Sequence, residues 1–109
     1  MILTTATAIE GYRIKEVIGL VYGDSLRTRG WWGRLVSQAE SIIGGRATAY
    51  LHEMEKGRKA AKENLIRNAA SMGANAVIGI DTDWAEVLEG FMFVSINGTA
   101  VIVEVKEDA

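Results

Sequence analysis

The chain has 109 residues, a formal net charge of −2 and no cysteine. Its 49% hydrophobic and 24% charged residues are typical of one globular domain over residues 1–109, and the charge gives no reason to expect nucleic acid as a partner. The lack of cysteine excludes disulfides, thiolate metal sites and cysteine nucleophiles. Because the sequence shows no signal peptide and no apolar run of about 20 residues, we expect a cytoplasmic protein with no membrane segment.

The N-terminal half of the chain predicts a main strand followed by a short helix. Residues 2–5 have the composition of a short initial strand, and residues 14–23 are rich in β-branched and apolar residues, which predicts the first main strand. Residues 24–30 carry charges and a glycine and are typical of an exposed connection. Between residues 31 and 43, apolar side chains recur at helical spacing, which predicts a short amphipathic helix that ends at the following glycine pair.

A long helix is expected next, from about Arg46 to Met72, with Gly73 as its C-terminal cap in the left-handed region. Apolar residues advance along this segment by alternating steps of four and three, which is the spacing of one helix face. We expect the apolar stripe to hold positions 47, 51, 54, 58, 61, 65, 68 and 72, of which six are apolar.

Two further strands are expected at residues 76–85 and 91–105. A crossover through the helix makes the first two main strands parallel, and the last strand forms a hairpin with its predecessor. The predicted fold class is therefore α+β, a two-layer βαββ domain. It has a three-stranded antiparallel sheet in the order 1-3-2, packed on one long helix, with a short helix before it.

The predicted strands are apolar on both faces. An antiparallel sheet with one wet face alternates apolar and polar residues, whereas neighbours such as Val17 and Ile18 here place apolar groups on opposite sides. One helix covers only one face, so the other would expose more apolar surface than soluble monomers usually do. We therefore expect a homo-oligomer. The alternative is that the short helix covers this face, with Trp31 and Trp32 as wedges.

Two groups of residues are candidates for binding. Asp81 and Asp83 lie two apart on a strand and so share a face, and paired carboxylates bind hard cations or act in acid–base chemistry. The alternative is a solvated strand end. The segment Gly44-Gly45-Arg46 begins the long helix, where free N–H groups and an arginine favour a small anion such as phosphate. The alternative is that these glycines only separate two helices.

Other chemistry has little support in the sequence. His52 is the one histidine, and a lone imidazole makes neither a zinc site nor a catalytic triad. Trp31 and Trp32 are candidates to anchor an interface or line a ligand pocket, with core packing as the alternative. We predict no catalytic residue, no cofactor and no confident metal ligand.

Several blocks of sequence carry a resemblance to a known family. They are the opening Ile9–Gly23, then Gly44-Gly45-Arg46…Tyr50, Met72-Gly-Ala-Asn-Ala-Val-Ile-Gly-Ile-Asp81 and Val94-Ser-Ile-Asn-Gly-Thr-Ala100. In this order they resemble the YbjQ family of small bacterial and archaeal proteins of unassigned function. The resemblance covers nearly the whole chain.

The resemblance implies a subunit similar to that of dodecin, assembled into a ring that is a pentamer. The family also carries a heavy-metal-binding label. Soft metals favour thiolate and imidazole ligands, and with no cysteine and one histidine here, no ligand residue is carried over. The positions that match the blocks of the family are mostly glycines, which indicates that they serve the backbone conformation more than any chemistry.

The leading interpretation is thus a cytoplasmic homo-oligomeric binding or scaffold protein, whose ligand lies at a subunit interface or in the central channel of the ring. The second hypothesis is binding of a hard cation or small anion through Asp81, Asp83 or Arg46. A third is an enzyme that uses Asp81 or Asp83 as a general base. Self-association is the only partnership that we expect, with no nucleic acid and no membrane.

Overall fold

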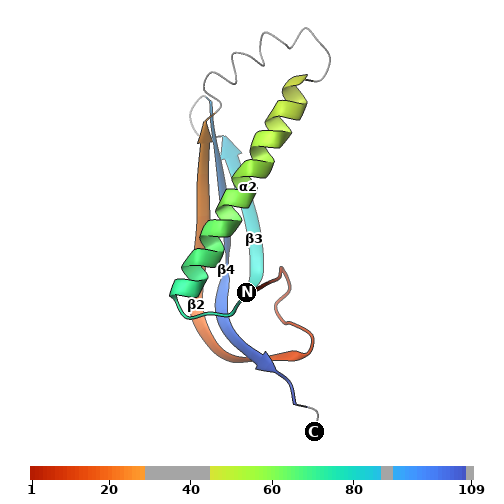
Figure 1. The fold of residues 1–109 in the computed structure, drawn as a ribbon, viewed down its shortest axis with the longest axis vertical. Coiled ribbons are helices and arrows are strands. Elements are labelled where there is room, and N and C mark those ends of the chain that lie inside the picture. The colour runs from red at the N-terminus through yellow and green to blue at the C-terminus, as the bar shows by residue number, and fades with distance from the viewer. Residues whose placement is uncertain (29–44, 87–89, 108–109) are drawn as a thin grey trace.

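The computed structural model describes residues 1–28, 45–86 and 90–107, and within these residues a single helix lies across one face of a four-stranded sheet (Figure 1). In chain order the elements are β1 (Ile2–Leu3), β2 (Tyr12–Thr28), α2 (Gly45–Ser71), β3 (Ala76–Glu86) and β4 (Phe91–Val105). The sheet order is β1-β3-β4-β2. β4 is antiparallel to both of its neighbours, and β1 is parallel to β3.

The α+β class fits the structure, but the predicted sheet was wrong, because the sheet is mixed and has four strands instead of three antiparallel ones. The fourth strand is β1, which lies in the segment expected to form a short initial strand and pairs with the outer edge of β3. Thr4 N–H donates to the Val77 carbonyl at 3.1 Å, and Ile80 N–H donates to the Thr4 carbonyl at 3.1 Å. These bonds satisfy backbone groups that an open edge would leave unpaired. The predicted short helix at residues 31–43 lies outside the described residues, and α2 is the one helix within them.

β2 is longer than predicted, since residues 24–28, expected in a connection, continue the strand. They pair with the first residues of β4, from Asp24 opposite Ser95 to Thr28 opposite Phe91. Contacts with the helix hold this polar end of the strand in place. The Ser25 hydroxyl donates to the Gly57 carbonyl at 2.7 Å.

The helix has nearly the predicted bounds, and Gly73 follows it with a φ of 88°, as a left-handed cap requires. The buried face differs from the predicted stripe. Its buried residues are spaced by four: Glu53, Gly57, Ala61, Leu65 and Ala69. Because three of these five are glycine or alanine, the helix backbone lies close to the sheet.

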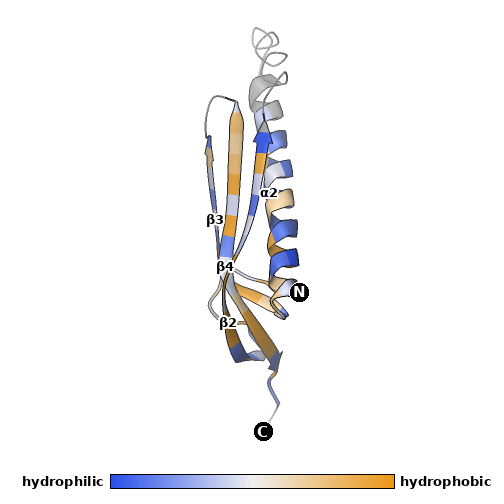
Figure 2. Ribbon diagram, turned by 90° about the vertical axis from the view of Figure 1, so that its left-hand side faces the viewer, coloured by the Kyte–Doolittle hydropathy of each residue, from blue (hydrophilic) through white to orange (hydrophobic). Residues whose placement is uncertain are grey.

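The helix and the sheet enclose the main hydrophobic core. Its buried residues are Val21, Ala61, Leu65, Ala69, Val77, Val94, Ile96 and Ala100. Figure 2 shows hydrophobic residues along β4 and at the lower end of the sheet, while most of α2 is hydrophilic.

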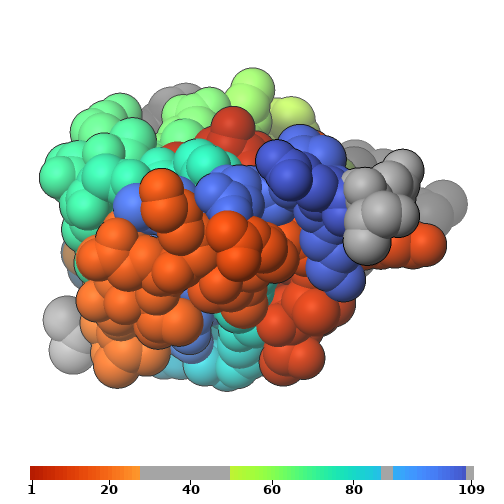
Figure 3. All heavy atoms as spheres, turned by 90° about the horizontal axis from the view of Figure 1, so that it is seen from below, coloured from red at the N-terminus to blue at the C-terminus, as the bar shows by residue number. Residues whose placement is uncertain are grey.

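A second, smaller core lies on the other face of the sheet, which we call the open face. Its buried residues are Ala76, Ile78, Val101 and Val103, and they are packed against by Ile2, Ile9 and Tyr12. Figure 3 shows the N-terminal residues, the lower end of β2 and the C-terminal residues gathered at this end of the molecule. The chain thus covers the lower end of its own open face.

Further along β2, the open face keeps an exposed row of apolar side chains. Val17, Leu20, Tyr22 and Leu26 are 61%, 67%, 52% and 60% exposed. The last three alternate with the helix-facing Val21 and Gly23, which places them on the face away from α2. We call these four residues the β2 apolar stripe.

Candidate functional site

The two predicted aspartates lie on the open face of β3, and β4 separates them from the β2 apolar stripe. Asp81 is opposite Asn97 and Asp83 is opposite Ser95 in the β3–β4 pair, so both carboxylates share a face, as expected. On the other side of Ser95 lies Asp24, which accepts a 2.6 Å hydrogen bond from the Ser95 hydroxyl. All three carboxylates are exposed.

These carboxylates do not form a metal cluster in the single chain. Within residues 1–28, 45–86 and 90–107, no three histidine or acidic side chains lie close enough to hold an ion. Asp81 and Asp83 therefore remain a candidate site that offers only two carboxylates.

The other predicted site residues are placed only incompletely. Arg46 belongs to the first turn of α2, but its side chain lies outside the described residues, as do Trp31 and Trp32. His52 is exposed on α2. Of these residues, only His52 can be placed relative to Asp81 and Asp83, and it belongs to the helix that covers the opposite face of the sheet.

Sequence reasoning missed a group of ionic contacts between α2 and β2. Glu53 is 8% exposed, and its carboxylate lies 3.2 Å from Arg27 Nε and 3.6 Å from Lys56 Nζ. A carboxylate this buried needs such partners. Only its spacing of four from the other buried helix residues could have marked Glu53 as buried. We interpret it as a structural residue.

Asparagines on α2 cover the outer edge of β2. The side-chain amides of Asn64 and Asn68 donate to the carbonyl oxygens of Asp24 and Tyr22, each at 2.7 Å. These carbonyls are two residues apart and so point to the same edge, and β2 is an edge strand of the sheet. An exposed edge is a site for unwanted strand pairing, and the amides block it over this stretch.

Asn75, within one of the blocks that carry the family resemblance, extends the sheet with its side chain. Its Nδ2 donates to the Val103 carbonyl at 2.9 Å, and Val103 N–H donates to its Oδ1 at 2.8 Å. The amide thus takes the place of a strand backbone just before β3 begins at Ala76. Asn75 therefore has a structural role, although its place in a block that carries the family resemblance could suggest a binding or catalytic role.

Replacing Asn75 with alanine is expected to lower the free energy of unfolding by about 2 kcal/mol, because two partly buried hydrogen bonds are lost. Urea unfolding followed by circular dichroism measures this. Ser71→Ala is the control, since it removes only an exposed bond within the helix and should cost less than about 0.5 kcal/mol. Equal stability of the two variants would contradict the role given to Asn75.

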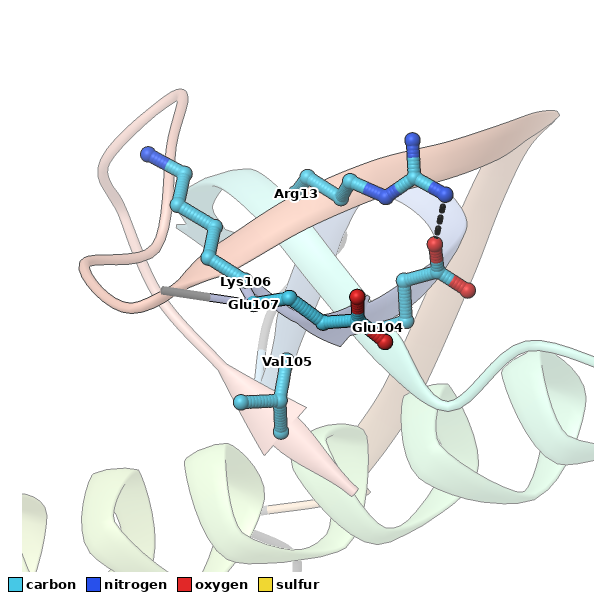
Figure 4. A pocket seen from close by; sticks show the side chains of 5 residues that line it. All are labelled: Arg13, Glu104, Val105, Lys106 and Glu107. Carbon is cyan, nitrogen blue, oxygen red and sulfur yellow. Dashed lines mark ion pairs between the residues drawn. The ribbon is translucent and has the colours of Figure 1, made fainter. Parts of the chain in front are cut away.

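One hollow of about 580 Å³ lies at the C-terminal end of the sheet and is lined by Arg13, Glu104, Val105, Lys106 and Glu107. Figure 4 shows Arg13 and Glu104 paired across neighbouring strands, while Val105 and Lys106 point in other directions. Two cationic and two acidic side chains give this hollow no net charge, so it does not select a charged ligand.

A smaller hollow of about 260 Å³ lies between α2 and β3, beside the N-terminal residues. It is lined by Leu3, Thr4, Thr5, Lys62, Leu65, Ile80, Thr82 and Ile96. None of these eight residues is acidic, and one is a lysine. The hollow therefore combines an apolar floor with a positive charge.

The fold is that of a small two-layer α+β domain, in which one helix covers one face of a mixed sheet. Within the described residues, no helix is long and apolar enough to cross a membrane. The YbjQ family model, described as "Putative heavy-metal-binding", matches residues 1–104, and the chain belongs to this family.

Relatives with a similar length support the assignment. A UPF0145 protein of Anoxybacillus flavithermus is 38% identical over 101 residues, which cover 93% of this chain and 96% of the relative. A UPF0145 protein of Sulfurisphaera tokodaii is 38% identical over 103 residues, which cover 94% and 90%. These names state no activity.

A solved structure shows the same fold. It is that of a protein of unknown function from Pediococcus pentosaceus, assigned to the DUF74 family. The TM-score is 0.58 at 20% identity, over 95% of this chain and 98% of the other.

The residues of this chain do not fit the heavy-metal description of the family model. Soft metal ions favour thiolate and imidazole ligands, whereas the chain has no cysteine and one histidine, the exposed His52. Among the residues that the structure describes, no three histidine or acidic side chains lie together. We therefore derive no chemistry through a heavy metal.

Proposed function

We propose that this protein works as a homo-oligomeric binding or scaffold protein of the cytoplasm, in which copies associate through the open face of the sheet. The observation that carries the proposal is the β2 apolar stripe, whose four side chains are each more than half exposed in the single chain. Burying such a stripe stabilises an assembly by about 25 cal/mol per Å² before the costs of association are subtracted.

The shape of the single chain also supports association. Its radius of gyration is 18.0 Å, whereas a compact domain of about 100 residues has about 13 Å. Its accessible surface is 7315 Å², against about 5,900 Å² for a typical monomer of this mass. An elongated sheet with one helix leaves surface that copies of the chain can bury.

The edge of β2 argues for contact through the face of the strand rather than through its edge. Asn64 and Asn68 already occupy two carbonyls on the outer edge, so a second strand cannot pair there without displacing them.

A pentamer is the ring size that the family resemblance implies. Native mass spectrometry of protein purified from its own cells would report the number of chains and any small molecule carried with them. The proposal predicts five chains, and a single chain would overturn it.

A second candidate function is binding of a hard cation by the open face, favoured by Asp24, which lies between Tyr22 and Leu26 of the stripe, and by Asp81 and Asp83 on β3. Association through this face would bring carboxylates of neighbouring copies together, and hard cations prefer such oxygen ligands. Calorimetric titration with Ca²⁺, Mg²⁺, Mn²⁺ and Zn²⁺ tests this candidate. Titration with phosphate tests the alternative of an anion at the start of α2. No heat with any of these ligands would discard both ideas.

A further inference from the structure

The hollow between α2 and β3 exists because the helix lies across β2 and β4, so the helix-facing side of β3 is only partly covered. The hollow is lined by Ile80 and Thr82 of β3, by Lys62 and Leu65 of α2, and by Ile96 of β4. In Figure 1 the N-terminus lies beside the lower end of β3, and Leu3, Thr4 and Thr5 also line the hollow.

The floor of the hollow is apolar and belongs to the core. Leu65 and Ile96 are 0% and 6% exposed, and Leu3 and Ile80 pack against the same core. The wall near the N-terminus is fixed by hydrogen bonds of the Thr4 backbone to Val77 and Ile80, both at 3.1 Å. The hollow is thus preformed, which lowers the cost of ordering residues around a ligand.

The rim of the hollow is polar and carries one positive charge. Within the described residues, the side chains of Lys62, Thr5 and Thr82 form no hydrogen bond or ion pair. The Thr4 hydroxyl accepts a bond from Ala6 N–H at 3.0 Å, and its own proton stays available to a ligand. One ammonium and three hydroxyls therefore surround an apolar floor, with no acidic side chain to oppose an anion.

We propose that this hollow binds a small aliphatic monocarboxylate, with its carboxylate at Lys62 and the threonine hydroxyls and its alkyl chain on Leu65, Ile80 and Ile96. A single lysine matches a single negative charge, and a charge-assisted hydrogen bond orients it. The volume of about 260 Å³ equals roughly nine water molecules in the liquid, which limits the ligand to a short chain. All lining residues belong to one chain, so the site is independent of self-association.

The test is a titration of the full-length ¹⁵N-labelled protein with hexanoate, followed by the amide chemical shifts in NMR spectra. We expect shifts centred on Thr4, Lys62 and Thr82, and weaker binding of the neutral hexanamide and of hexylammonium. Lys62→Met keeps the alkyl stem and removes the charge, so it should raise the dissociation constant of hexanoate about tenfold. Lys59→Met is the matched control, because Lys59 is exposed on the same helix but does not line the hollow, and it should leave the constant unchanged.

A second variant tests the location without changing charge. Thr82→Phe fills the hollow from an exposed strand position, where an aromatic residue is well tolerated, and it should abolish the shifts. The proposal is overturned if hexanoate shifts no amide around the hollow, or if hexanamide binds equally well. Unchanged binding in Lys62→Met or in Thr82→Phe would also overturn it. None of these results depends on the number of chains in the assembly.

Discussion

Replacing Gly23 with alanine is expected to lower the free energy of unfolding by more than about 3 kcal/mol. An added Cβ would overlap the Ala61 carbonyl oxygen and the Leu65 backbone nitrogen, and would lie 2.7 Å from Leu65 Cα. All three atoms belong to the backbone of α2, so no side-chain rotation relieves the overlap. The helix has to move away from β2, which opens the main core around Val21 and Leu65. Urea unfolding followed by circular dichroism measures the change.

The same substitution at Gly57 is the matched control, because it also adds a methyl group between helix and sheet. There the nearest atom is Val94 Cγ2 at 3.0 Å, which is the end of a side chain. Alanine also favours a helix over glycine by about 1 kcal/mol, which offsets the crowding. We expect Gly57→Ala to lie within about 1 kcal/mol of the parent protein. If Gly23→Ala were equally harmless, the close approach of α2 to β2 would be contradicted.

The double variant Leu20→Glu and Leu26→Glu is expected to convert the assembly into folded monomers at micromolar concentration. Both leucines are at least 60% exposed in the single chain, so the charges cost the isolated subunit little. In the proposed assembly each substitution would remove a buried leucine, worth about 1.5–3 kcal/mol, and would bury a carboxylate without a partner. Sedimentation velocity measures the mass, and circular dichroism shows whether the subunit stays folded.

Leu51→Glu is the control for this loss of association. Leu51 is 59% exposed, like the stripe residues, but it lies on α2 and not on the open face. Adding a carboxylate there tests whether any exposed leucine has the same effect. We expect this variant to sediment like the parent protein. Dissociation by Leu51→Glu, with the stripe variant still assembled, would place the interface on the helix instead of on β2.

The sequence predicted the elements better than it predicted how they combine. The bounds of α2 and of the last two strands follow from hydrophobic spacing and from Gly73, which are local signals. The parallel pairing of β1 with β3 was missed, since a strand of two residues has no periodicity and its place depends on the open edge of β3. The polar end of β2 was also missed, because its pairing with β4 outweighs its composition.

The helix face shows why a pattern of apolar residues can mislead. Leu51 and Met72 belong to the predicted stripe, yet they are 59% and 37% exposed. The buried face instead carries Gly57, which fits because β2 lies close to the helix there. Hydrophobicity alone does not indicate a contact made by small residues.

The candidate site was predictable only in its simplest feature, the shared face of Asp81 and Asp83, which the period of a strand dictates. The hollow beside Lys62 was not predictable, because its walls come from four separate elements. The backbone role of Asn75 needs the position of Val103, which no local pattern contains.

Sedimentation equilibrium of the unaltered protein across the micromolar range tests the central claim most directly. If the β2 apolar stripe is buried between copies, the measured mass will be a multiple of 11.8 kDa, with five chains as the expected number. A single species of 11.8 kDa over the whole range would show that one chain keeps this face stable by itself, and would contradict the account.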